Sequence, residues 1–399
     1  MRINRSKAVA AGACALIVTG VAACGSSSSG GGSASSSSGS TSSIPNLGIN
    51  SFTRDFSVMT QLKSLASAGQ GSIGVILPDT TSSARYTEFD APYLQKAFQQ
   101  AGLSSSDYSI KNANGSNSQF VTDAQAMITN GASVLLIDPE DAGTGGRVAQ
   151  LAQQHGVAVI DYDRITHGSY YISFNNVQVG KLIGQGFGQC AQAWGVSKPD
   201  LIEMAGDPTD NNAKQFQQGY DSVISQNSDW TVAATPAGTW TPHTALTEFQ
   251  GAYTAHKGVN SAIIPNDENA APIITYLQNQ GIKAKTFPIT GQDATLVGLQ
   301  NILSGYQCGT AYKPIYLEAQ AAAAVALFAR AGKTPPSSLV NGSVANPNEN
   351  GKKMPSVLLT PQWVTTQNMQ STVIADNFVT AKELCTSKYQ SACQAAGIS

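Results

Sequence analysis

Short apolar runs alternate with stretches of helical periodicity from Ser72 onwards, and this alternation restricts the fold more than any other feature of the sequence. The runs are rich in valine and isoleucine, as buried parallel strands are. They are Ile73–Leu77, Ser133–Ile137, Val157–Ile160, Leu201–Ala205, Ala262–Ile264, Phe287–Thr290 and Gly309–Tyr312. A β-α-β-α order predicts parallel sheets with helices on both faces. At 399 residues the chain has room for two such units.

The stretch from Val157 to Asn176 predicts both a ligand site and a change of unit. Its first apolar run ends abruptly in charge, at Asp163 and Arg164. Ligands of open α/β sheets bind outside the carboxyl ends of the strands, so a site is expected at this edge. A second short run, Tyr170–Phe174, ends where a new helical pattern opens. We interpret this point as a hinge at which the chain passes from one lobe to the other.

The first residues have the pattern of a bacterial lipoprotein signal. Basic residues precede an apolar stretch that is too short for a membrane span and ends in Val-Ala-Ala-Cys. This end resembles a lipobox, so we expect cleavage of residues 1–23 and lipidation of Cys24. An ordinary signal peptide is the alternative. Residues 24–43 then form a lipid-anchored Ser/Gly tether, which would hold the protein at the outer face of the cytoplasmic membrane. Residues 44–71 are an N-terminal extension without an assigned role.

The cysteines suggest an exported, disulfide-bonded protein. Four cysteines remain beyond the signal and Cys24, an even number, and they allow three pairings. Cys385 and Cys393 are close together, which makes this pair the default and leaves Cys190 with Cys308. Free buried thiols are the alternative. The net charge of −2 and the absence of a basic tract argue against a nucleic-acid partner.

Polar side chains follow the strand runs in both halves of the chain. A neutral sugar offers hydroxyls that donate and accept, so its site needs carboxylates, cationic donors and amides, together with a flat apolar surface for the ring. The strand ends supply such a mixture, with Tyr86 and Trp240 as candidate platforms. The polar candidates are Asp163, Arg164, Asp210, Asn212, Asn266, Asp293 and Lys313.

The chain from about Ser72 to Phe378 resembles the sugar-binding proteins of ABC importers with the type I periplasmic-binding fold, most closely the D-xylose-binding ones. The matching runs are Tyr162-Asp163-Arg164-Ile165, Tyr171-Ile172-Ser173-Phe174-Asn175-Asn176, Asp210-Asn211-Asn212-Ala213-Lys214, Trp240-x-Pro242, Asn266-Asp267, Gly291-Gln292-Asp293-Ala294 and Tyr312-Lys313-Pro314-Ile315. Xylose binders tend to carry Arg-Trp where this chain has Arg85-Tyr86, and a smaller platform would shift the preferred sugar.

This resemblance implies two doubly wound lobes joined by a hinge of three segments. Lobe 1 would comprise residues 72–175 and 313–360, and lobe 2 residues 176–312 and 361–399. By the same resemblance a monosaccharide, D-xylose or another pentose, would lie between them. Arg85 and the polar candidates above would hydrogen-bond this sugar, and Trp240 would stack on it. The expected partners are a membrane permease and the sugar, with the protein acting as a monomer without a cofactor.

Three other functions compete with sugar binding for import. An enzyme is disfavoured because no histidine has metal-ligand spacing and no nucleophile elbow or P-loop occurs. A sugar-responsive transcription regulator would need an N-terminal helix-turn-helix, where this chain has a signal and a tether. A sensor that presents ribose, arabinose, glucose or galactose to a receptor stays open, because sequence does not separate sensing from import.

Overall fold

Seven strands form the sheet of lobe 1, in the order β11-β12-β5-β4-β3-β1-β2. All neighbours pair in parallel except β11 and β12, which form an antiparallel edge. This computed structural model describes residues 46–398, so the predicted signal, Cys24, the tether and residues 44–45 lie outside the described residues. The strands are β1 (Ser72–Leu77), β2 (Tyr108–Asn112), β3 (Ala132–Ile137), β4 (Ala158–Tyr162), β5 (Tyr170–Phe174), β11 (Gly342–Asn346) and β12 (Lys352–Leu359).

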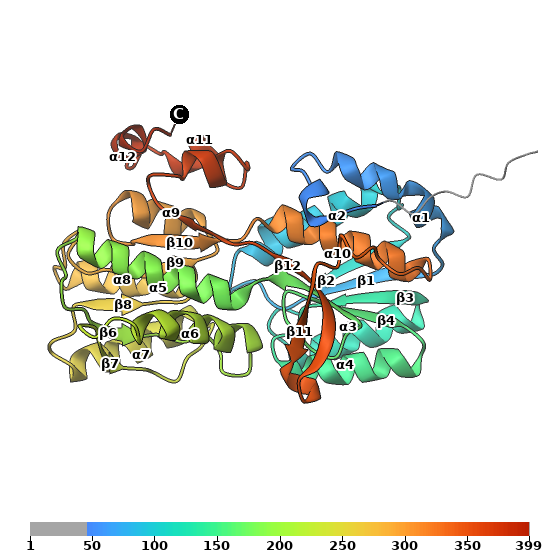
Figure 1. Cartoon of the computed structure of the whole chain (residues 1–399), viewed down its shortest axis with the longest axis horizontal. Coiled ribbons are helices and arrows are strands. Elements are labelled where there is room, and N and C mark those ends of the chain that lie inside the picture. The colour runs from blue at the N-terminus through green and yellow to red at the C-terminus, as the bar shows by residue number, and fades with distance from the viewer. Residues whose placement is uncertain (1–45, 399) are drawn as a thin grey trace, which may run out of the picture. The chain divides into compact units, whose positions relative to one another are not determined.

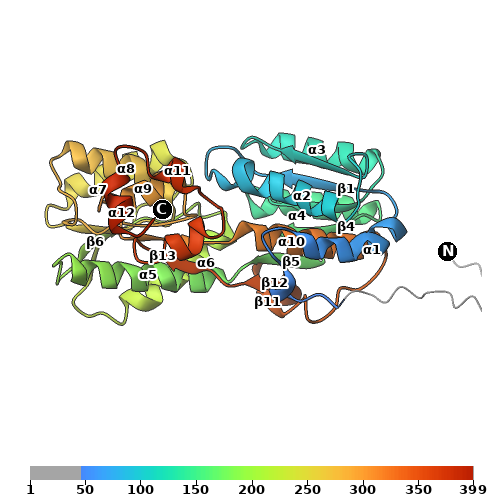
Figure 2. The same ribbon diagram turned by 90° about the horizontal axis from the view of Figure 1, so that it is seen from above.

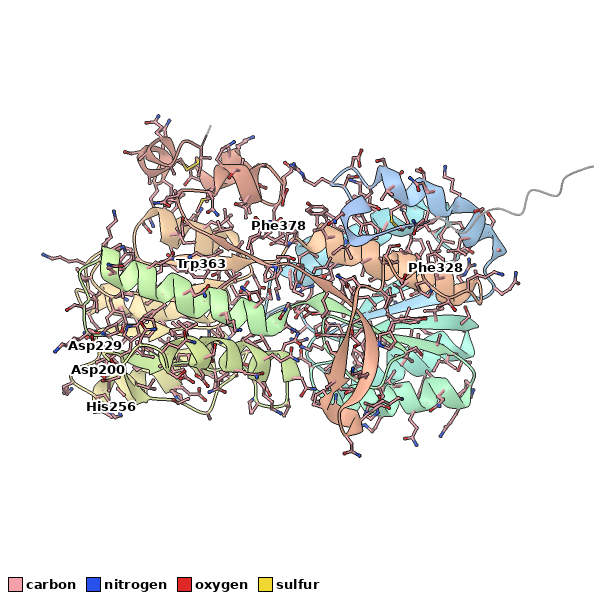
Figure 3. All side chains as sticks on the ribbon, in the orientation of Figure 1. Asp200, Asp229, His256, Phe328, Trp363 and Phe378 are labelled. Atoms are coloured by element: carbon pink, nitrogen blue, oxygen red, sulfur yellow. A yellow bond between two sulfur atoms is a disulfide. The ribbon has the colours of Figure 1, made fainter. Side chains whose placement is uncertain are left out.

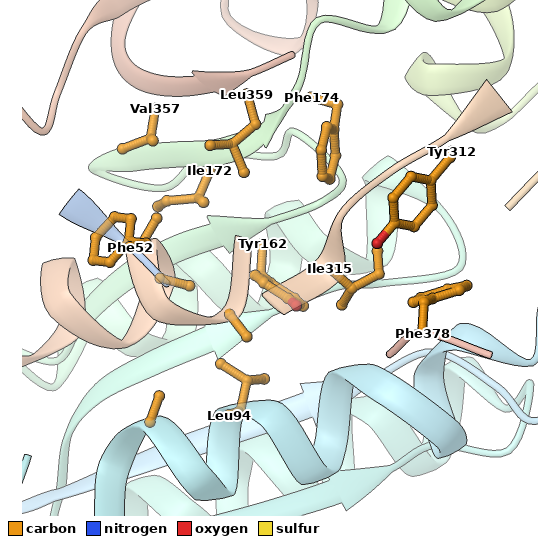
Figure 4. Close-up of a cluster of buried hydrophobic side chains, with 14 of the residues drawn as sticks. Phe52, Leu94, Tyr162, Ile172, Phe174, Tyr312, Ile315, Val357, Leu359 and Phe378 are labelled. Carbon is orange, nitrogen blue, oxygen red and sulfur yellow. The ribbon is translucent and has the colours of Figure 1, made fainter. Parts of the chain in front are cut away.

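Helices cover both faces of this sheet (Figure 1). On one face α10 (Ile315–Arg330) lies against the strands and α2 (Ala91–Gln100) packs against α10. The other face carries α3 (Asn117–Thr129) and α4 (Ala142–Gln154). Alanine dominates α10, and the helix is buried almost all round because it is enclosed by the sheet and α2. Figure 4 shows part of the resulting apolar core, in which Leu94 lies near Tyr162.

Lobe 2 contains two short sheets, in the orders β7-β6-β8 and β13-β10-β9. A parallel bridge between Ala262 and Ile289 connects them at β8 and β9. Its strands are β6 (Asp200–Glu203), β7 (Thr231–Ala234), β8 (Ser261–Ile263), β9 (Thr290–Gln292), β10 (Gly309–Tyr312) and β13 (Gln362–Val364). Its helices are α5 (Asn176–Ala193), α6 (Asn211–Ile224), α7 (Pro242–Ala255), α8 (Asp267–Asn279) and α9 (Leu296–Leu303).

The chain passes between the lobes three times, which confirms the expected α/β fold with a three-segment hinge. It leaves lobe 1 after β5, returns after β10 and leaves again after β12, as Figure 2 shows from above. Because each lobe contains pieces from distant parts of the sequence, the precise lobe boundaries given above stay a prediction.

The two terminal segments pack on opposite lobes. In the N-terminal extension, η1 (Ile49–Ser51) comes first, and η2 (Ser57–Leu62) and α1 (Lys63–Ala68) pack against α2 and α10. At the other end, α11 (Ala381–Leu384) packs against α9, and α12 (Gln390–Ala395) follows. Phe378 reaches back between the lobes, where its ring stacks on Phe89 at 3.8 Å (Figure 3).

Both expected disulfides are present. Cys190–Cys308 ties α5 to the start of β10, and Cys385–Cys393 closes the short segment between α11 and α12. Among the described residues, no helix is long and apolar enough to cross a membrane.

The apolar pair Val373–Ile374 in the C-terminal tail predicts a short strand, and this prediction is wrong. Residues Gln370–Ile374 form a π-helix, η5, instead. Met369 and Val373 are both buried and stand four residues apart, a helical spacing that the short apolar pair concealed. Strand β11 was not expected at all, because its Gly-Ser-Val-Ala-Asn sequence carries little apolar signal.

Two glycines allow α5 and α6 to pack backbone against backbone. A Cβ atom at Gly180 would lie 1.9 Å from the carbonyl oxygen of Phe216, and one at Gly219 would lie 2.4 Å from that of Val177. These neighbours are helix backbone, which cannot move aside as a flexible side chain would. The close contact fixes α6, and α6 begins at the edge where the candidate site lies.

We therefore expect Gly180→Ala to lower the free energy of unfolding by about 3 kcal/mol, the upper end of the usual range for overpacking. Gly251→Ala is the matched control, because Gly251 lies in α7 with nothing within 4 Å of its added Cβ. That change should raise stability by about 0.5–1 kcal/mol. Denaturant titration of both variants measures the difference, and equal stabilities would contradict the packing account.

Candidate ligand-binding site

A cavity with about 310 Å³ of empty space lies between the strand ends of the two lobes. The structure brings together there all ten residues predicted to bind the ligand, from both lobes and the hinge. Four further lining residues were missed, namely Ser82, Ser83, Phe216 and Gln292. The two serines follow β1 in a loop without strong local signal, and Phe216 has the helical spacing of an ordinary core residue. Gln292 stands inside a quoted sequence run, so it was within reach of the sequence.

Asp163 is placed by the turn that follows β4. Its backbone is in the left-handed region, with φ of +58°, and its N–H donates to the carbonyl oxygen of Ile172 at 2.8 Å. A non-glycine residue in this region is uncommon and is held there by its surroundings. The turn aims the Asp163 carboxylate at Arg85, whose Nη1 lies 3.0 Å from Oδ1.

Arg85 stands at the centre of a buried charge cluster. Its Nε and Nη2 atoms each donate to a different oxygen of Asp90 at 2.8 Å, and Nη2 also donates to Glu318 at 2.6 Å. The π-helix Tyr86–Asp90, η3, follows Arg85 directly and supplies both Asp90 and Tyr86. Protein carboxylates therefore contact all three guanidinium nitrogens, Nη1 through Asp163.

The single positive charge of Arg85 cannot neutralise all three of these carboxylates. The pKa is lowered at Asp163 and raised at Glu318. Burial raises the pKa of Asp163, but the charges of Arg85, Lys313 and Arg164 outweigh burial and lower it to about 2. At Glu318 burial prevails over the attraction of Arg85 and raises the pKa to about 8. Asp163 therefore keeps its charge more readily than Glu318, whose burial favours the protonated form.

Arg164 connects the two lobes. Its Nη1 lies 3.1 Å from Asp138 at the end of β3, and its Nε lies 3.1 Å from Asp210 in lobe 2. Asp210 caps α6 by accepting from the backbone N–H of Asn212 at 2.8 Å. The same carboxylate accepts from the indole Nε1 of Trp240 at 2.9 Å. One hydrogen-bonded group thus orients a cation, a helix and an aromatic ring at the cavity wall.

Trp240 and Asn212 have little freedom of their own. The Trp240 ring lies so close to Gly206 that a Cβ there would be 2.2 Å from it, and the ring edge meets Phe216 at 6.3 Å between centroids. The Asn212 side chain donates to the carbonyl oxygen of Asp163 at 3.0 Å and accepts from Asn176 at 2.9 Å. Asn212 therefore holds the two strand edges together as well as lining the cavity.

The loop after β1 contacts lobe 2 on the other side of the cavity. Asn266, the N-cap of α8, donates to the carbonyl oxygen of Ser82 at 3.0 Å. Ser83 Oγ donates to Asp293 at 2.8 Å, and the N–H of Ala84 donates to Glu268 at 3.0 Å. Lys313 from the hinge lies 3.2 Å from the other oxygen of Asp293.

Three buried polar atoms at the cavity wall make no hydrogen bond of good geometry within residues 46–398. Gln292 Oε1 has no polar partner, whereas Arg85 Nη1 and Asp293 Oδ1 have only their ion-pair contacts, to Asp163 and Lys313. Buried polar groups are nearly always hydrogen-bonded, so these three atoms have hydrogen-bonding capacity left for a ligand. Across the same residues there is no cluster of three or more His, Cys, Asp or Glu side chains suited to a metal.

A second, larger groove of about 1,700 Å³ runs beside α4 and β12. Its charged lining residues, among them Arg147, Lys352 and Lys353, are partly or fully exposed. None of its lining atoms is a buried polar atom without a partner. The inter-lobe cavity is accordingly the candidate site.

Comparison with known proteins assigns the family. Residues 73–334 match the model of the periplasmic binding protein domain, which is more than half of the chain. The chain belongs to the periplasmic binding protein family. The expected family is thereby confirmed.

Two relatives and one solved structure illustrate the similarity. The D-xylose-binding periplasmic protein of Escherichia coli is 34% identical over 285 residues, 69% of this chain and 82% of the relative. The multiple sugar-binding periplasmic receptor ChvE of Rhizobium radiobacter is 29% identical and covers 79% of this chain and 93% of its own. An ABC transporter solute binding protein from Clostridium phytofermentans, with bound beta-D-glucose, has a TM-score of 0.68 at 24% identity, over 78% of this chain and 99% of that one. At this identity the structural match shows the shared fold.

Several buried carboxyls in this binding protein have raised pKa values, and burial is the main cause for each. The affected groups are Glu318, at about 8, and Glu140, Asp161, Glu203 and Asp267, each at about 7. A carboxyl whose pKa is raised on folding binds its proton more tightly in the folded chain. Its stabilising effect is complete below the unfolded pKa of about 4 and is lost as the pH rises through the folded value.

We therefore expect the thermal midpoint to fall between about pH 5 and about pH 8. The lowered pKa of Asp163 does not oppose this trend, because its stabilising effect is lost only below about pH 4. Glu203→Gln removes one of the titrating groups, so the fall should be smaller in that variant. Scanning calorimetry in buffers of equal ionic strength checks this, and a midpoint that rises over the same range would contradict it.

Proposed function

We propose that this chain is the extracytoplasmic substrate-binding component of an ABC sugar importer and that it binds one monosaccharide, D-xylose or another pentose, in the inter-lobe cavity. The observation that carries the proposal is the joint lining of one buried cavity by charged, amide and aromatic side chains of both lobes. The D-xylose-binding relative supports the choice of sugar.

The chemistry of the lining suits a neutral polyol. Asp163, Asp210 and Asp293 accept hydrogen bonds, Arg164 and Lys313 donate, and amide side chains do both. Hydrogen bonds in which one partner is charged are stronger than neutral ones. They would offset the free-energy cost of removing water from the sugar hydroxyls. The residues that line the cavity include three cations and three aspartates, so the lining itself offers no excess charge to a charged ligand.

The cavity is nearly filled by its own side chains. Of its 310 Å³ of empty space only about 20 Å³ is free volume, room for about one water molecule, so a sugar ring enters only as the lobes move apart. Tyr86, Phe216 and Trp240 give it aromatic surface from both lobes. A pentopyranose lacks the exocyclic carbon of a hexose, so it makes the smaller demand on this space.

Ligand binding would favour the form in which the lobes meet. Neither lobe surrounds the cavity alone, so only the closed arrangement offers the ligand all its partners. A ligand shifts a conformational equilibrium toward the state that it binds more tightly. The closed shape would then report occupancy to a permease, with the protein acting as a monomer.

A sensor role with a different sugar is the second candidate. A relative named as a receptor for multiple sugars and the presence of Tyr86 where xylose binders tend to carry tryptophan both favour it. Ribose, arabinose, glucose and galactose are the sugars to compare with xylose.

Calorimetry of the purified chain with these five sugars tests the function. We expect D-xylose or another aldopentose to bind most tightly, and Arg164→Ala to weaken binding by about 2–4 kcal/mol, or about 30- to 1000-fold. That variant leaves Asp138 and Asp210 without their cation. Arg147→Ala, in α4 outside the cavity, is the matched control and should bind as the wild type does.

The possible outcomes separate the sugar from the function. If no aldopentose binds below about millimolar concentration but a hexose does, the pentose assignment is wrong and the sugar-binding function stands. If none of the five sugars binds, the proposed function itself is contradicted.

We also propose that Cys24 anchors the protein to the membrane through lipid, on the strength of the lipobox and the Ser/Gly tether behind it. Stable anchoring needs two or more acyl chains, which lipoprotein processing supplies. Cys24→Ser should release the protein into the medium or leave it unprocessed, whereas Cys14→Ser, inside the predicted signal, should change neither. Fractionation and immunoblotting measure this, and a processed Cys24→Ser protein that stays on the membrane would refute the anchor.

A further inference from the structure

A buried carboxylate organises the loop that carries Asp163 and Arg164. Asp161 has no exposed surface, and it accepts hydrogen bonds from the N–H of Thr166 at 2.6 Å, from Thr166 Oγ1 and from the N–H of Gly168 at 3.2 Å. The loop wraps so closely that a Cβ at Gly168 would lie 2.7 Å from Asp161 Oδ1. The path of the chain after Asp163 is therefore fixed from the inside by one side chain.

A second buried carboxylate accepts hydrogen bonds from a cavity loop in the same way in lobe 2. Asp267, at the first position of α8, accepts from the N–H of Thr295 at 2.9 Å and from its Oγ1 at 3.3 Å. It also accepts from Gln307 at 2.7 Å and from Thr310 Oγ1 at 3.1 Å. Glycines at 291 and 298 leave room for it, since a Cβ at either would come within 2.2 Å of its oxygens.

The two loops share an unusual backbone. Asp293 has φ of +88° and Ala294 of +52°, as Asp163 has +58° in lobe 1. In each loop the cavity aspartate donates its N–H to the neighbouring strand, Asp163 to Ile172 and Asp293 to Ala311, each within 3.0 Å. Such conformations persist only where the surroundings over-determine them. In each lobe a threonine that binds the buried carboxylate follows within three residues of the aspartate.

We propose that Asp161 and Asp267 are positioning residues of the ligand site, which never touch the ligand but hold Asp163, Arg164 and Asp293 in the orientation that binds it. Neither residue lines the cavity. The proposal rests on the proposed sugar-binding function, and it adds two residues, one in each lobe, to the machinery of that site.

Only a carboxylate suits these two positions. Each accepts three or more hydrogen bonds and donates none, whereas an asparagine in the same place would turn an N–H group toward one of the donors. Burial raises the pKa of both groups to about 7. Glu349 near Asp161 and Asp293 near Asp267 contribute in the same direction. The test is therefore made at about pH 8, where both carboxyls are ionised.

The first experiment measures D-xylose binding by calorimetry for the full-length Asp161→Asn and Asp267→Asn variants. We expect the dissociation constant to rise about 10- to 100-fold in each, by analogy with the loss of side chains that orient metal ligands. Glu203→Gln is the matched control, because it removes a buried carboxyl of lobe 2 that binds Gln217 and does not line the cavity. Wild-type affinity in both aspartate variants would overturn the proposal.

A pair of gentler variants separates positioning from packing. Thr166→Val keeps the shape of the side chain and loses the donor to Asp161, whereas Thr166→Ser keeps the donor and loses the methyl group that packs near Gly145. If positioning is the role, Thr166→Val weakens D-xylose binding and Thr166→Ser restores it. If Thr166→Ser is the weaker binder, the residue acts through packing and the proposal is wrong for this loop.

Hydrogen exchange read by mass spectrometry tests the same claim without sugar. Asp161→Asn should speed exchange in peptides covering residues 162–169, and Asp267→Asn in those covering 291–299, so each variant is the control for the other. Faster exchange spread over the whole chain would show general destabilisation and overturn the proposal. If the wild type binds none of the five sugars, the proposed function has failed, while the exchange data still decide whether these two aspartates fix the loops.

Discussion

The contact of Arg164 with one carboxylate in each lobe is the interaction on which the site depends. Asp138 belongs to the sheet of lobe 1 and Asp210 to the first turn of a helix in lobe 2. Removing such charges from water is expensive, and a buried ion pair contributes little net stability, but loss of one partner is strongly destabilising. Arg164 therefore contributes little to stability. Its charge has both carboxylate partners only when the lobes meet.

The other contacts across the cavity have the same character. Asn212 donates to the backbone of Asp163, Asn266 to that of Ser82, and Ser83 to Asp293. These are short polar contacts between groups that water satisfies equally well when the lobes separate. Because water replaces such bonds when the lobes separate, they contribute little net stability to the closed form, and the added contacts of a ligand shift the equilibrium toward it.

Much of the site could be predicted from sequence because the fold is an open parallel sheet. The carboxyl ends of parallel strands meet at one edge, so residues as distant as Asp163 and Asp293 were expected together before any contact was known. The partners of Arg85 could not be found this way. Glu318 lies in an alanine-rich helix, far along the chain, and only the tertiary fold brings it to Arg85. Asp161 binds the loop from inside and Asp163 lines the cavity because the chain makes a left-handed turn at Asp163. The sequence, with two aspartates two residues apart, does not predict this turn.

The central claim is that a sugar between the lobes holds them closed, and small-angle X-ray scattering with and without saturating D-xylose tests it most directly. The account predicts a smaller radius of gyration in the presence of the sugar, because the hinge of three segments lets the empty lobes separate. Tight binding of D-xylose, shown by calorimetry on the same sample, with an unchanged radius of gyration would contradict it.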